Sequence, residues 1–535
     1  MPKPILRRHF LKTTGVAAAA LLGSPLLAAC GPDGHALSAP TPDPNFKPDL
    51  EVTLTATTGE AAILPGTATK VWTYRGEVVS GDPTSLMTIP NSYLGPILRL
   101  RQGQKVRITF ANDLPGSEQE SIIHWHGLQV PAAMDGHPRD AVGPGHSYVY
   151  EFEVTDRAGT YWFHPHPHGL TATQVNAGLA GLLIVSDDEG DATALPAGDQ
   201  DVALVIQDRV FDADNQFAYS TDMMTAMMGF LGDTVLINGR AHESLGLATR
   251  AYRFRILNGS NARIYKLAWS DATPLIVLAT DGGLLEAPIE RSYVMLAPGE
   301  RIELWVDFSG RETGDEVKLV SQAFSGAENV GGGGMMGGHL MGGATNGPGV
   351  GAAQDLLTLR VERQEVDTLS LPATLTPLAR LDPTEAVNAA QPRVITITQQ
   401  RMQWKLNGRG FEMDAVADDE RVLAGTLELW DIVNDVNPGE MMDPLGMAHP
   451  FHIHGVQFQV ITRTLRDDYP ELAPGYASVN EGFIDTGWKD TVLVMPGETV
   501  RLLLRLPGQP GRFVYHCHNL EHADAGMMRN YEVQA

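Results

Sequence analysis

A length of 535 residues allows three to four domains. The formal net charge of −25 disfavours nucleic acid as a partner and favours cations, although ordinary solubility is an equally good reason for it. The two cysteines, Cys30 and Cys517, lie in an N-terminal leader and in a C-terminal metal-ligand pattern, so we expect no disulfide and a protein held together by its hydrophobic cores.

Residues 1–30 predict an export signal. A twin-arginine motif, Arg7-Arg8-His9-Phe10-Leu11-Lys12, precedes a run of small apolar residues that ends at Ala29. A membrane-anchor helix is the alternative interpretation. Leu27-Ala28-Ala29-Cys30 resembles a bacterial lipoprotein box, which predicts a lipidated Cys30, although a cysteine just past such a run is also found incidentally. We therefore expect export by the twin-arginine route to the periplasm or cell surface, with membrane attachment through Cys30.

Most of the remaining chain predicts β-structure. Residues 31–48 are proline-rich and polar, as in a flexible tether. From residue 49 onward, short runs such as 106–110 and 149–154 alternate apolar and polar residues. The 56 glycines and 35 prolines punctuate these runs, and few long helical patterns appear. The sequence therefore predicts an all-β protein made of β-sandwiches.

The expected boundaries lie near residue 190 and in a linker at 364–392. They divide the chain into three sandwiches at 49–190, 191–363 and 393–535.

Methionine clusters in two places within the second sandwich. The insert at 325–353 is rich in glycine, which contributes no apolar surface and cannot build a core. It is either a flexible loop or a segment that captures Cu(I) through thioether groups. In the second case the ligands are Met335, Met336, Met341 and His339. The other cluster, Met223–Met228, predicts a short apolar helix packed on a core rather than a copper site.

Histidine pairs separated by one residue occur far more often than chance allows. With 17 histidines in the chain, chance would give roughly 0.5 such pairs. This spacing puts both rings on one face of a strand, and imidazole is a good copper ligand. Four pairs lie in predicted strand contexts: His124/His126, His164/His166, His452/His454 and His516/His518.

The segment Tyr515–Met528 adds sulfur ligands. Cys517 lies between the last two paired histidines, with His522 and Met527 downstream. Two histidines, a cysteine and a weak axial methionine form the ligand set of a blue-copper site, and His449 is the remaining candidate for the second histidine. Because neighbouring side chains on a strand point to opposite faces, the sequence predicts two metal centres joined by one residue. A structural zinc site or a buried cysteine with incidental histidines is the alternative.

These motifs strongly resemble those of the multicopper oxidases, in particular the bacterial three-domain type that includes cuprous oxidases of copper resistance and bacterial laccases. The resemblance runs from about Leu54 to Tyr531 and includes the segments Gly487–Val492 and Thr280–Leu285. It implies three cupredoxin-like Greek-key β-sandwiches, a middle one without a copper centre, and four copper ions.

The resemblance also implies the ligands. The type 1 copper takes His449, Cys517, His522 and axial Met527; the type 2 copper takes His124 and His452; the type 3 pair takes His126, His164 and His518 on one ion and His166, His454 and His516 on the other.

Two further roles follow from the resemblance. Asp135 matches a family acid that supplies protons to the trinuclear cluster. A second family acid corresponds to Ala523 here, so Asp524, Glu521 or water must substitute, or proton delivery is slower. Glu440 with Met441 or Met442 is the candidate site for a substrate Cu(I), although the extra residues before His449 depart from the expected spacing.

The implied reaction is four one-electron oxidations coupled to the reduction of O2 to two waters. Electrons enter at the type 1 copper and pass through Cys517, His516 and His518 to the trinuclear cluster. The expected reductant is Cu(I), a phenol or another aromatic, and we expect a monomer. The alternatives are a laccase that acts mainly on aromatics, a non-catalytic copper-binding scaffold, and the less favoured copper nitrite reductase.

Overall fold

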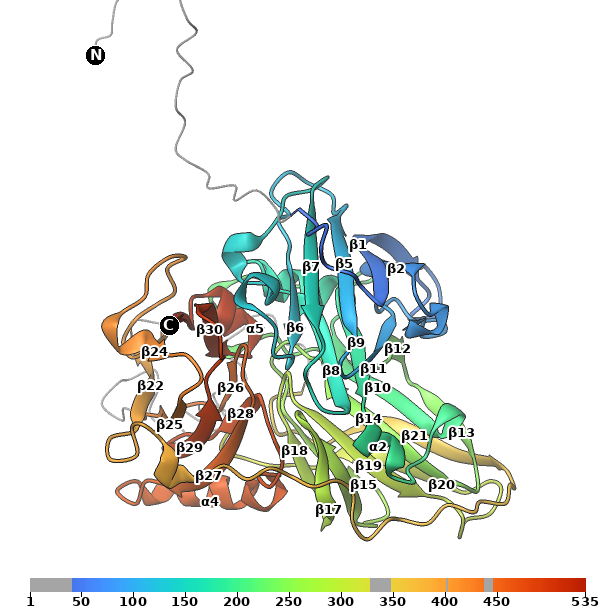
Figure 1. The fold of residues 1–535 in the computed structure, drawn as a ribbon. Coiled ribbons are helices and arrows are strands. Elements are labelled where there is room, and N and C mark those ends of the chain that lie inside the picture. Colours follow the sequence, from blue (N-terminus) through green and yellow to red (C-terminus); the bar gives the residue numbers. More distant parts are fainter. Residues whose placement is uncertain (1–40, 328–347, 401–402, 437–445) are drawn as a thin grey trace, which may run out of the picture. The chain divides into compact units, whose positions relative to one another are not determined.

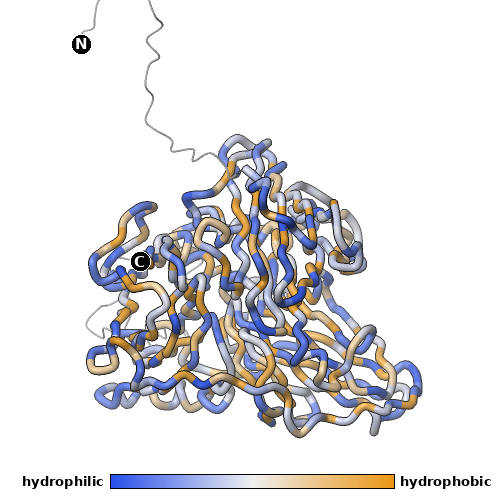
Figure 2. The backbone as a smooth tube through the Cα atoms, viewed as in Figure 1, coloured by the Kyte–Doolittle hydropathy of each residue, from blue (hydrophilic) through white to orange (hydrophobic). Residues whose placement is uncertain are grey.

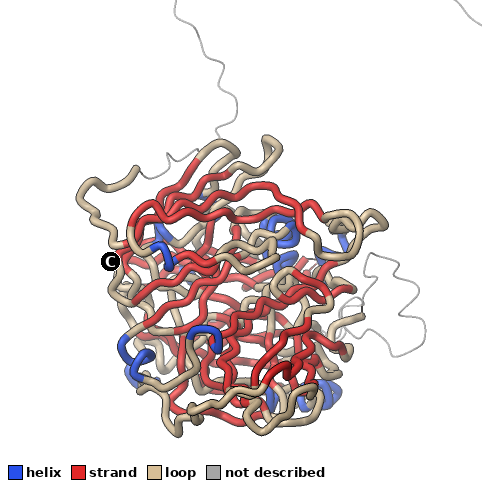
Figure 3. The backbone as a smooth tube through the Cα atoms, turned by 90° about the vertical axis from the view of Figure 1, so that its right-hand side faces the viewer, coloured by secondary structure: helices blue, strands red, loops and turns tan. Residues whose placement is uncertain are grey.

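The computed structural model describes residues 41–327, 348–400, 403–436 and 446–535. Strands form most of its regular structure, and helices are short (Figure 3). The strands make six sheets, which pack in pairs as three β-sandwiches. The expectation of an all-β fold of three cupredoxin-like sandwiches is therefore confirmed. None of the helices in the described part of the chain is long and apolar enough to cross a bilayer.

The first sandwich lies within residues 50–186 (blue to cyan in Figure 1). One sheet has the order β2 (Thr69–Ser80), β1 (Leu50–Ala61), β5 (Lys105–Asn112), β7 (Ser147–Glu153). The other has the order β3 (Leu86–Met87), β4 (Ile97–Arg101), β9 (Gly181–Ser186), β8 (Gly159–Pro165), β6 (Ile123–His126).

The second sandwich lies within residues 201–363. One sheet has the order β12 (Arg240–Ala241), β11 (Thr234–Ile237), β10 (Asp201–Arg209), β14 (Ala251–Asn258), β19 (Arg301–Asp307), β16 (Leu275–Thr280), β17 (Gly283–Arg291). The other has the order β13 (Ser244–Ala248), β21 (Gln354–Arg363), β20 (Glu316–Ser321), β15 (Tyr265–Trp269), β18 (Val294–Leu296).

The third sandwich lies within residues 393–534 (orange to red in Figure 1). One sheet has the order β23 (Gln403–Leu406), β22 (Arg393–Gln400), β25 (Leu427–Asn434), β29 (Glu498–Arg505), β27 (Phe458–Leu465). The other has the order β24 (Arg421–Leu423), β31 (Met528–Gln534), β30 (Gly511–Cys517), β26 (His449–Ile453), β28 (Thr491–Val494). The α-helices are α1 (Thr171–Ala177), α2 (Asp188–Ala192), α3 (Met223–Met228), α4 (Ala473–Ala477) and α5 (Leu520–Asp524).

The three sandwiches repeat one topology. Each contains a parallel strand pair in the first sheet, namely β1–β5, β10–β14 and β22–β25, inside a mainly antiparallel arrangement. Each second sheet contains a parallel pair as well, namely β4–β9, β13–β21 and β24–β31. Parallel neighbours need a crossover connection, so these pairs mark a Greek-key path rather than a simple meander.

Strand periodicity decides which residues form the cores. In β1, Leu50, Val52, Leu54 and Ala56 are fully buried while the residues between them are only partly buried, and Figure 2 shows this mixing of apolar and polar residues along the chain. Apolar clusters also join the sandwiches: Trp162 and Leu182 of the first pack with Leu236 and Leu257 of the second. A fully buried side chain of this kind contributes about 1.5–3 kcal/mol, so such seams hold the sandwiches together.

Several sequence-based expectations lie outside the described residues. They concern the leader 1–30, most of the tether at 31–48, and the central part of the glycine- and methionine-rich insert. The domain boundaries near 190 and across 364–392 remain predictions.

Candidate metal centres

Four strands from two sandwiches present the paired histidines. In the first sandwich β6 and β8 are antiparallel neighbours, and His124 lies opposite His164. In the third sandwich β26 and β30 are antiparallel neighbours, and His452 lies opposite His516. Opposite residues of a strand pair project to the same face of the sheet, so each pair of strands presents its imidazoles together.

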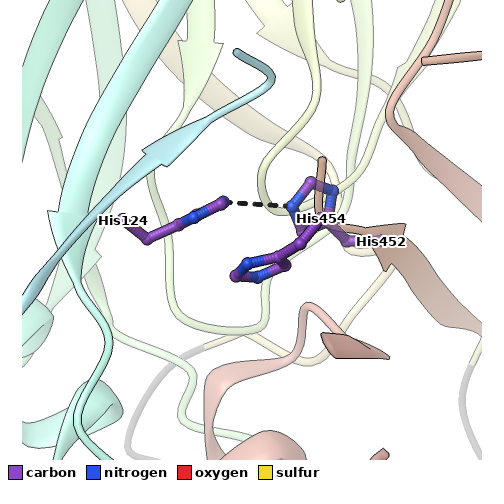
Figure 4. A group of neighbouring side chains, drawn as sticks. All are labelled: His124, His452 and His454. Atoms are coloured by element: carbon purple, nitrogen blue, oxygen red, sulfur yellow. Dashed lines mark hydrogen bonds between the residues drawn. The ribbon is translucent and has the colours of Figure 1, made fainter. Parts of the chain in front are cut away.

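The two sets of imidazoles meet in one buried cluster. His124 Nε2 lies 3.3 Å from His452 Nε2, and the ring of His454 stacks on that of His124 with 3.6 Å between centroids (Figure 4). His516 Nε2 lies 3.1 Å from His454 Nε2 and 3.3 Å from His166 Nε2. The other three rings have centroids 4.9, 5.4 and 5.7 Å apart: His126, His164 and His518.

Most of these rings bond to protein through one nitrogen and leave the other facing the cluster. The outer acceptors are Asp135 O for His124 Nδ1 (2.7 Å), Pro165 O for His164 Nδ1 (2.9 Å), Asp490 O for His452 Nδ1 (2.8 Å), Asp135 Oδ2 for His454 Nδ1 (2.7 Å), Cys517 O for His516 Nδ1 (2.9 Å) and Asp490 Oδ1 for His126 Nε2 (2.9 Å). Each acceptor fixes the proton on the outer nitrogen and leaves a lone pair on the inner one.

The inner nitrogens fit metal ions. Among the described residues, no hydrogen-bond partner exists for His126 Nδ1, for His164 Nε2 or for either ring nitrogen of His518. Burial and the neighbouring histidines lower the pKa of His126, His166 and His518 well below the usual value, so these rings are neutral. Neutral lone pairs that face one another at close range are stable only around cations, and imidazole suits copper.

A second cluster lies on the opposite face of β30. Cys517 Sγ is 3.5 Å from His449 Nδ1 and 3.6 Å from His522 Nδ1. Met527 is fully buried in the same core, and its carbonyl accepts from the backbone N–H of Cys517, so the two residues are neighbours. Burial raises the pKa of the Cys517 thiol, so a bound cation is needed to stabilise the thiolate. This set fits a copper ion with a thiolate, two imidazoles and a thioether.

Helix α3 covers the Cys517 cluster, although it belongs to the chain segment of the second sandwich. His522 Nε2 donates to Met227 O over 2.9 Å, and Trp404 Nε1 donates to the same carbonyl, also over 2.9 Å. The Met227 side chain packs in the core of the third sandwich, and the cap of the helix is the Asp222 carboxylate. The expected short apolar helix at Met223–Met228 is thus confirmed, and it packs on the third sandwich rather than on the second.

One buried ion pair ties all three sandwiches to the histidine cluster. Arg301 of β19 forms a two-pronged bond with Asp490, 2.8 Å to Oδ1 and 2.6 Å to Oδ2, and its Nε donates to Thr160 O of β8 over 2.9 Å. Asp490 in turn contacts His126 and His452. In the sequence, the segment around Asp490 stands out only as part of a resemblance, and Arg301 does not stand out at all, because a pairing between sandwiches leaves no local pattern.

Two glycines allow the second sandwich to approach this cluster. A Cβ atom on Gly127, which has φ +93°, would lie 2.6 Å from both Arg301 Nη2 and Asp490 Oδ2. A Cβ atom on Gly299, which has φ +85°, would lie 2.9 Å from the ring of His518. Both positions therefore need glycine for conformation and for space.

The candidate proton donors have different surroundings. Asp135 is fully buried, accepts from His454, and burial raises the pKa of its carboxyl well above the usual value. Glu521 accepts from Tyr219, Asn261 and the Phe230 backbone N–H.

Asp524 accepts from the backbone N–H groups of Thr171 and Ala172 at the start of α1. In the described part of the chain, the hydrogen bonds of Glu521 and Asp524 thus lead away from the histidine cluster. Asp135 is the one candidate acid that touches it.

Several expected site residues cannot be placed, because they lie outside the described residues: Cys30, Met335, Met336, Met341, Glu440, Met441 and Met442.

Comparisons with known proteins point to one family. Two family models described as multicopper oxidase match residues 70–190 and 386–535. A laccase of Bacillus stratosphericus is 30% identical over 496 residues, which cover 84% of this chain and 91% of that protein.

Solved structures point to the same family. The multicopper oxidase McoA of Aquifex aeolicus has a TM-score of 0.73 at 34% identity and covers 92% of this chain and 97% of its own. The multicopper oxidase of Campylobacter jejuni, described as a metallo-oxidase, has a TM-score of 0.68 at 26% identity and covers 91% of both chains.

Proposed function

Because the chain belongs to the multicopper oxidase family, copper-dependent oxidoreductases that use four copper ions to reduce O2, we propose that it is a cuprous oxidase that serves copper tolerance. The family and the general reaction confirm the expectation from the sequence: oxidation of Cu(I) or phenolic reductants is coupled to reduction of O2 to water. The choice of Cu(I) as the physiological reductant, and each residue's role, belong to the proposal.

The proposed ligands follow the two clusters. The type 1 copper would be held by His449, Cys517 and His522, whose ligand atoms lie within 4.8 Å of one another, and Met527 of the same core would complete the set. His166, His454 and His516 form a second set of this kind, and we assign one type 3 ion to them. The remaining assignments are His124 and His452 for type 2, and His126, His164 and His518 for the other type 3 ion.

The grouping of ligand atoms also brings His124 together with His126 and His164, and His124 together with His452 and His454. This overlap is expected where three ions share one compact set of imidazoles, and it leaves the type 2 and type 3 assignments as proposals.

Different residues of the chain would serve electron transfer, proton transfer and orientation of the histidine rings. Copper bound at the two clusters would supply one-electron transfer at Cys517 and oxygen chemistry among the histidines. Cys517 joins the clusters through its covalent neighbours His516 and His518, so an electron crosses β30 within one strand. Asp135 holds the proton of His454 Nδ1 and is placed to pass protons toward the cluster. Arg301 holds Asp490 in place, and Asp490 orients the rings of His126 and His452.

The observation that carries the choice of reductant is the closure of the Cys517 cluster. His449 and His522 are both 0% exposed, and the outer nitrogen of His522 is bonded to the Met227 carbonyl. A bulky phenol therefore cannot contact the ring edge of either histidine. A small ion needs no such contact, because a few ligands on the outer side of α3 are enough to bind it. Thioethers select Cu(I), and the exposed side chain of Met223 lies on this helix.

A second observation concerns the described residues that flank the two methionine-bearing segments. The glycine- and methionine-rich insert and the segment with Glu440, Met441 and Met442 lie far apart in sequence. The described residues that flank them are neighbours, because the Ala448 backbone N–H donates to Ala327 O over 3.0 Å. We propose that the two segments share a role in delivering Cu(I).

The site of action is part of the same proposal. The twin-arginine motif and Cys30 support export to the periplasm or cell surface with a lipid anchor, and the protein is proposed to act there as a monomer.

Oxygen uptake tests the choice of reductant. The copper-loaded protein is assayed with Cu(I) and with 2,6-dimethoxyphenol, each with and without added Cu(II). We expect kcat/KM to be at least tenfold higher for Cu(I), and phenol oxidation to rise when Cu(II) is added as a shuttle. A fast rate of phenol oxidation that is unchanged by added Cu(II), together with slow oxidation of Cu(I), would instead establish a laccase.

A further inference from the structure

A cleft of about 880 Å³ lies between the β1–β2 hairpin, helix α1 and the loop that precedes α3. Three aromatic side chains line it, Trp72, Phe217 and Tyr219, and all three are partly exposed. Phe217 is fixed by Tyr93 and Phe211, whose ring centroids lie 5.8 and 5.3 Å away. The aromatic wall is therefore formed before any ligand arrives, and it suits a flat ring.

The cleft also contains an unused hydrogen-bond donor. Asn176 of α1 lines it and is 1% exposed, and its Nδ2 has no hydrogen-bond partner among the described residues. A buried amide group without a partner is costly, and a ligand that carries an oxygen acceptor would satisfy it. Glu60 and Lys70 face each other across β1 and β2 at the rim, so their opposite charges select neither an anion nor a cation.

One wall of the cleft is connected to the Cys517 cluster by a hydrogen bond and a short stretch of main chain. The Tyr219 hydroxyl donates to Glu521 Oε1 over 2.9 Å. The Glu521 carboxylate is held in place by Asn261 Nδ2 and by the Phe230 N–H, and one peptide bond links Glu521 to His522. The path from the cleft to a proposed type 1 ligand thus consists of one aromatic ring, one hydrogen bond and one residue of main chain.

We propose that this cleft is a second reductant site, which binds a small neutral phenol and passes its electron through Tyr219 and Glu521 to the Cys517 cluster. The proposal rests on the proposed function, because α3 closes the direct approach to His522 and an aromatic reductant then needs another entrance. Each phenol loses one electron and one proton and leaves as a phenoxyl radical. The proton goes to water at the open mouth of the cleft, and four such events supply the four electrons that convert O2 and four protons to two waters.

Binding is tested first in the copper-free protein, which cannot oxidise the probe. Calorimetric titration with 2,6-dimethoxyphenol is expected to show one site per chain. Trp72→Leu should weaken binding at least tenfold because it removes one aromatic wall, and Asn176→Ala should weaken it several-fold because it removes the donor. A fold check by circular dichroism accompanies each variant. Unchanged binding in both variants would overturn the site.

The electron route is tested in the copper-loaded protein by a split between KM and kcat. Tyr219→Phe keeps the ring and removes only the hydroxyl, so kcat for the phenol should fall at least fivefold while its KM stays within twofold. The matched control is Tyr469→Phe, which removes the hydroxyl of a partly exposed tyrosine that packs on Arg466, away from the cleft. Equal kcat values in Tyr219→Phe and the wild type would overturn the route.

Oxidation of Cu(I) separates this proposal from the proposed function. If the cleft is a distinct entrance, the ratio of phenol turnover to Cu(I) turnover falls in Trp72→Leu and Tyr219→Phe. If both rates fall together, the cleft is part of the general structure and the proposal is wrong. If the wild type oxidises phenol but not Cu(I), the cuprous oxidase proposal fails, and the cleft is judged by its binding and KM results alone.

Discussion

The two faces of strand β30 make a natural comparison. On the Cys517 face, all proposed ligands lie between His449 and Met527, inside one sandwich, and α3 covers them with the Met227 carbonyl and side chain. On the His516 face, the ligands come from the first and third sandwiches, and Arg301 of the second sandwich orients them. The first face is therefore a local product of one domain, whereas the second exists only when three domains are docked. Substitutions that weaken the contacts between sandwiches should leave the Cys517 centre intact and disrupt the histidine centre.

The largest effect is expected from Cys517→Ser, which breaks the connection between the faces. A serine hydroxyl does not replace the thiolate, so the blue absorption should vanish and oxygen uptake should fall by at least two orders of magnitude. Copper bound on the histidine face should remain, as counted by metal analysis. Substantial uptake without the blue absorption would contradict the route through β30.

Arg301→Lys tests the dependence of the histidine face on docking. Lysine keeps the charge but loses the planar fork that bonds both oxygens of Asp490, so turnover should fall about tenfold with loss of type 2 and type 3 copper signals. The blue absorption should stay intact.

The matched control is Arg501→Lys, which breaks an equivalent fork to Asp431 on a partly exposed surface. Equal effects of the two substitutions on the copper signals would contradict a special role for Arg301.

Asp135→Asn tests the proton supply of the histidine face. The amide still accepts from His454 Nδ1 but cannot carry a proton, so turnover should fall at least tenfold while the blue absorption is unchanged. The measurement is oxygen uptake with Cu(I) over a range of pH, with the visible spectrum as control. A turnover equal to that of the wild type at every pH would refute the role.

The smallest effect concerns a charge at the seam between the first and third sandwiches. Asp156 is buried beside Gln129 and Gln457, and burial raises its pKa from 3.8 to about 7. The folded protein therefore holds a proton that the unfolded chain releases, and this group reduces stability as pH rises from about 4 to about 7.

Asp156→Asn removes this loss of stability, because an amide does not titrate. The difference in Tm between Asp156→Asn and the wild type should grow in favour of the variant by about 1–3 °C over the same window. A difference that stays constant or shrinks as pH rises would show that Asp156 is ionised in the folded protein.

The same contrast explains what the sequence could predict. Cys517, His522 and Met527 lie within one short segment, and strand alternation was enough to place Cys517 and His516 on opposite faces. The H-x-H pairs could be recognised because their spacing is local. Arg301 could not be found, since its contacts with Thr160 and Asp490 span more than a hundred residues and depend on how sandwiches dock.

Helix α3 shows a similar limit. Its methionine cluster predicted a short helix, but nothing in that segment indicates that its Met227 carbonyl would lie over His522. The Tyr219–Glu521 bond was hidden for the same reason, since it joins segments 302 positions apart. Residues that act through their own strand are visible in the sequence, whereas residues that act across an interface require the structure.

The most direct test of the central claim is the stoichiometry of Cu(I) oxidation. Cu(I) loss and O2 uptake are followed together in the copper-loaded protein, with hydrogen peroxide measured in the same vessel. The account predicts four Cu(I) oxidised per O2 and no peroxide, because electrons taken in at the Cys517 face are used together at the histidine face to make water. Two Cu(I) per O2 with accumulating peroxide, or no oxygen uptake at all, would contradict it.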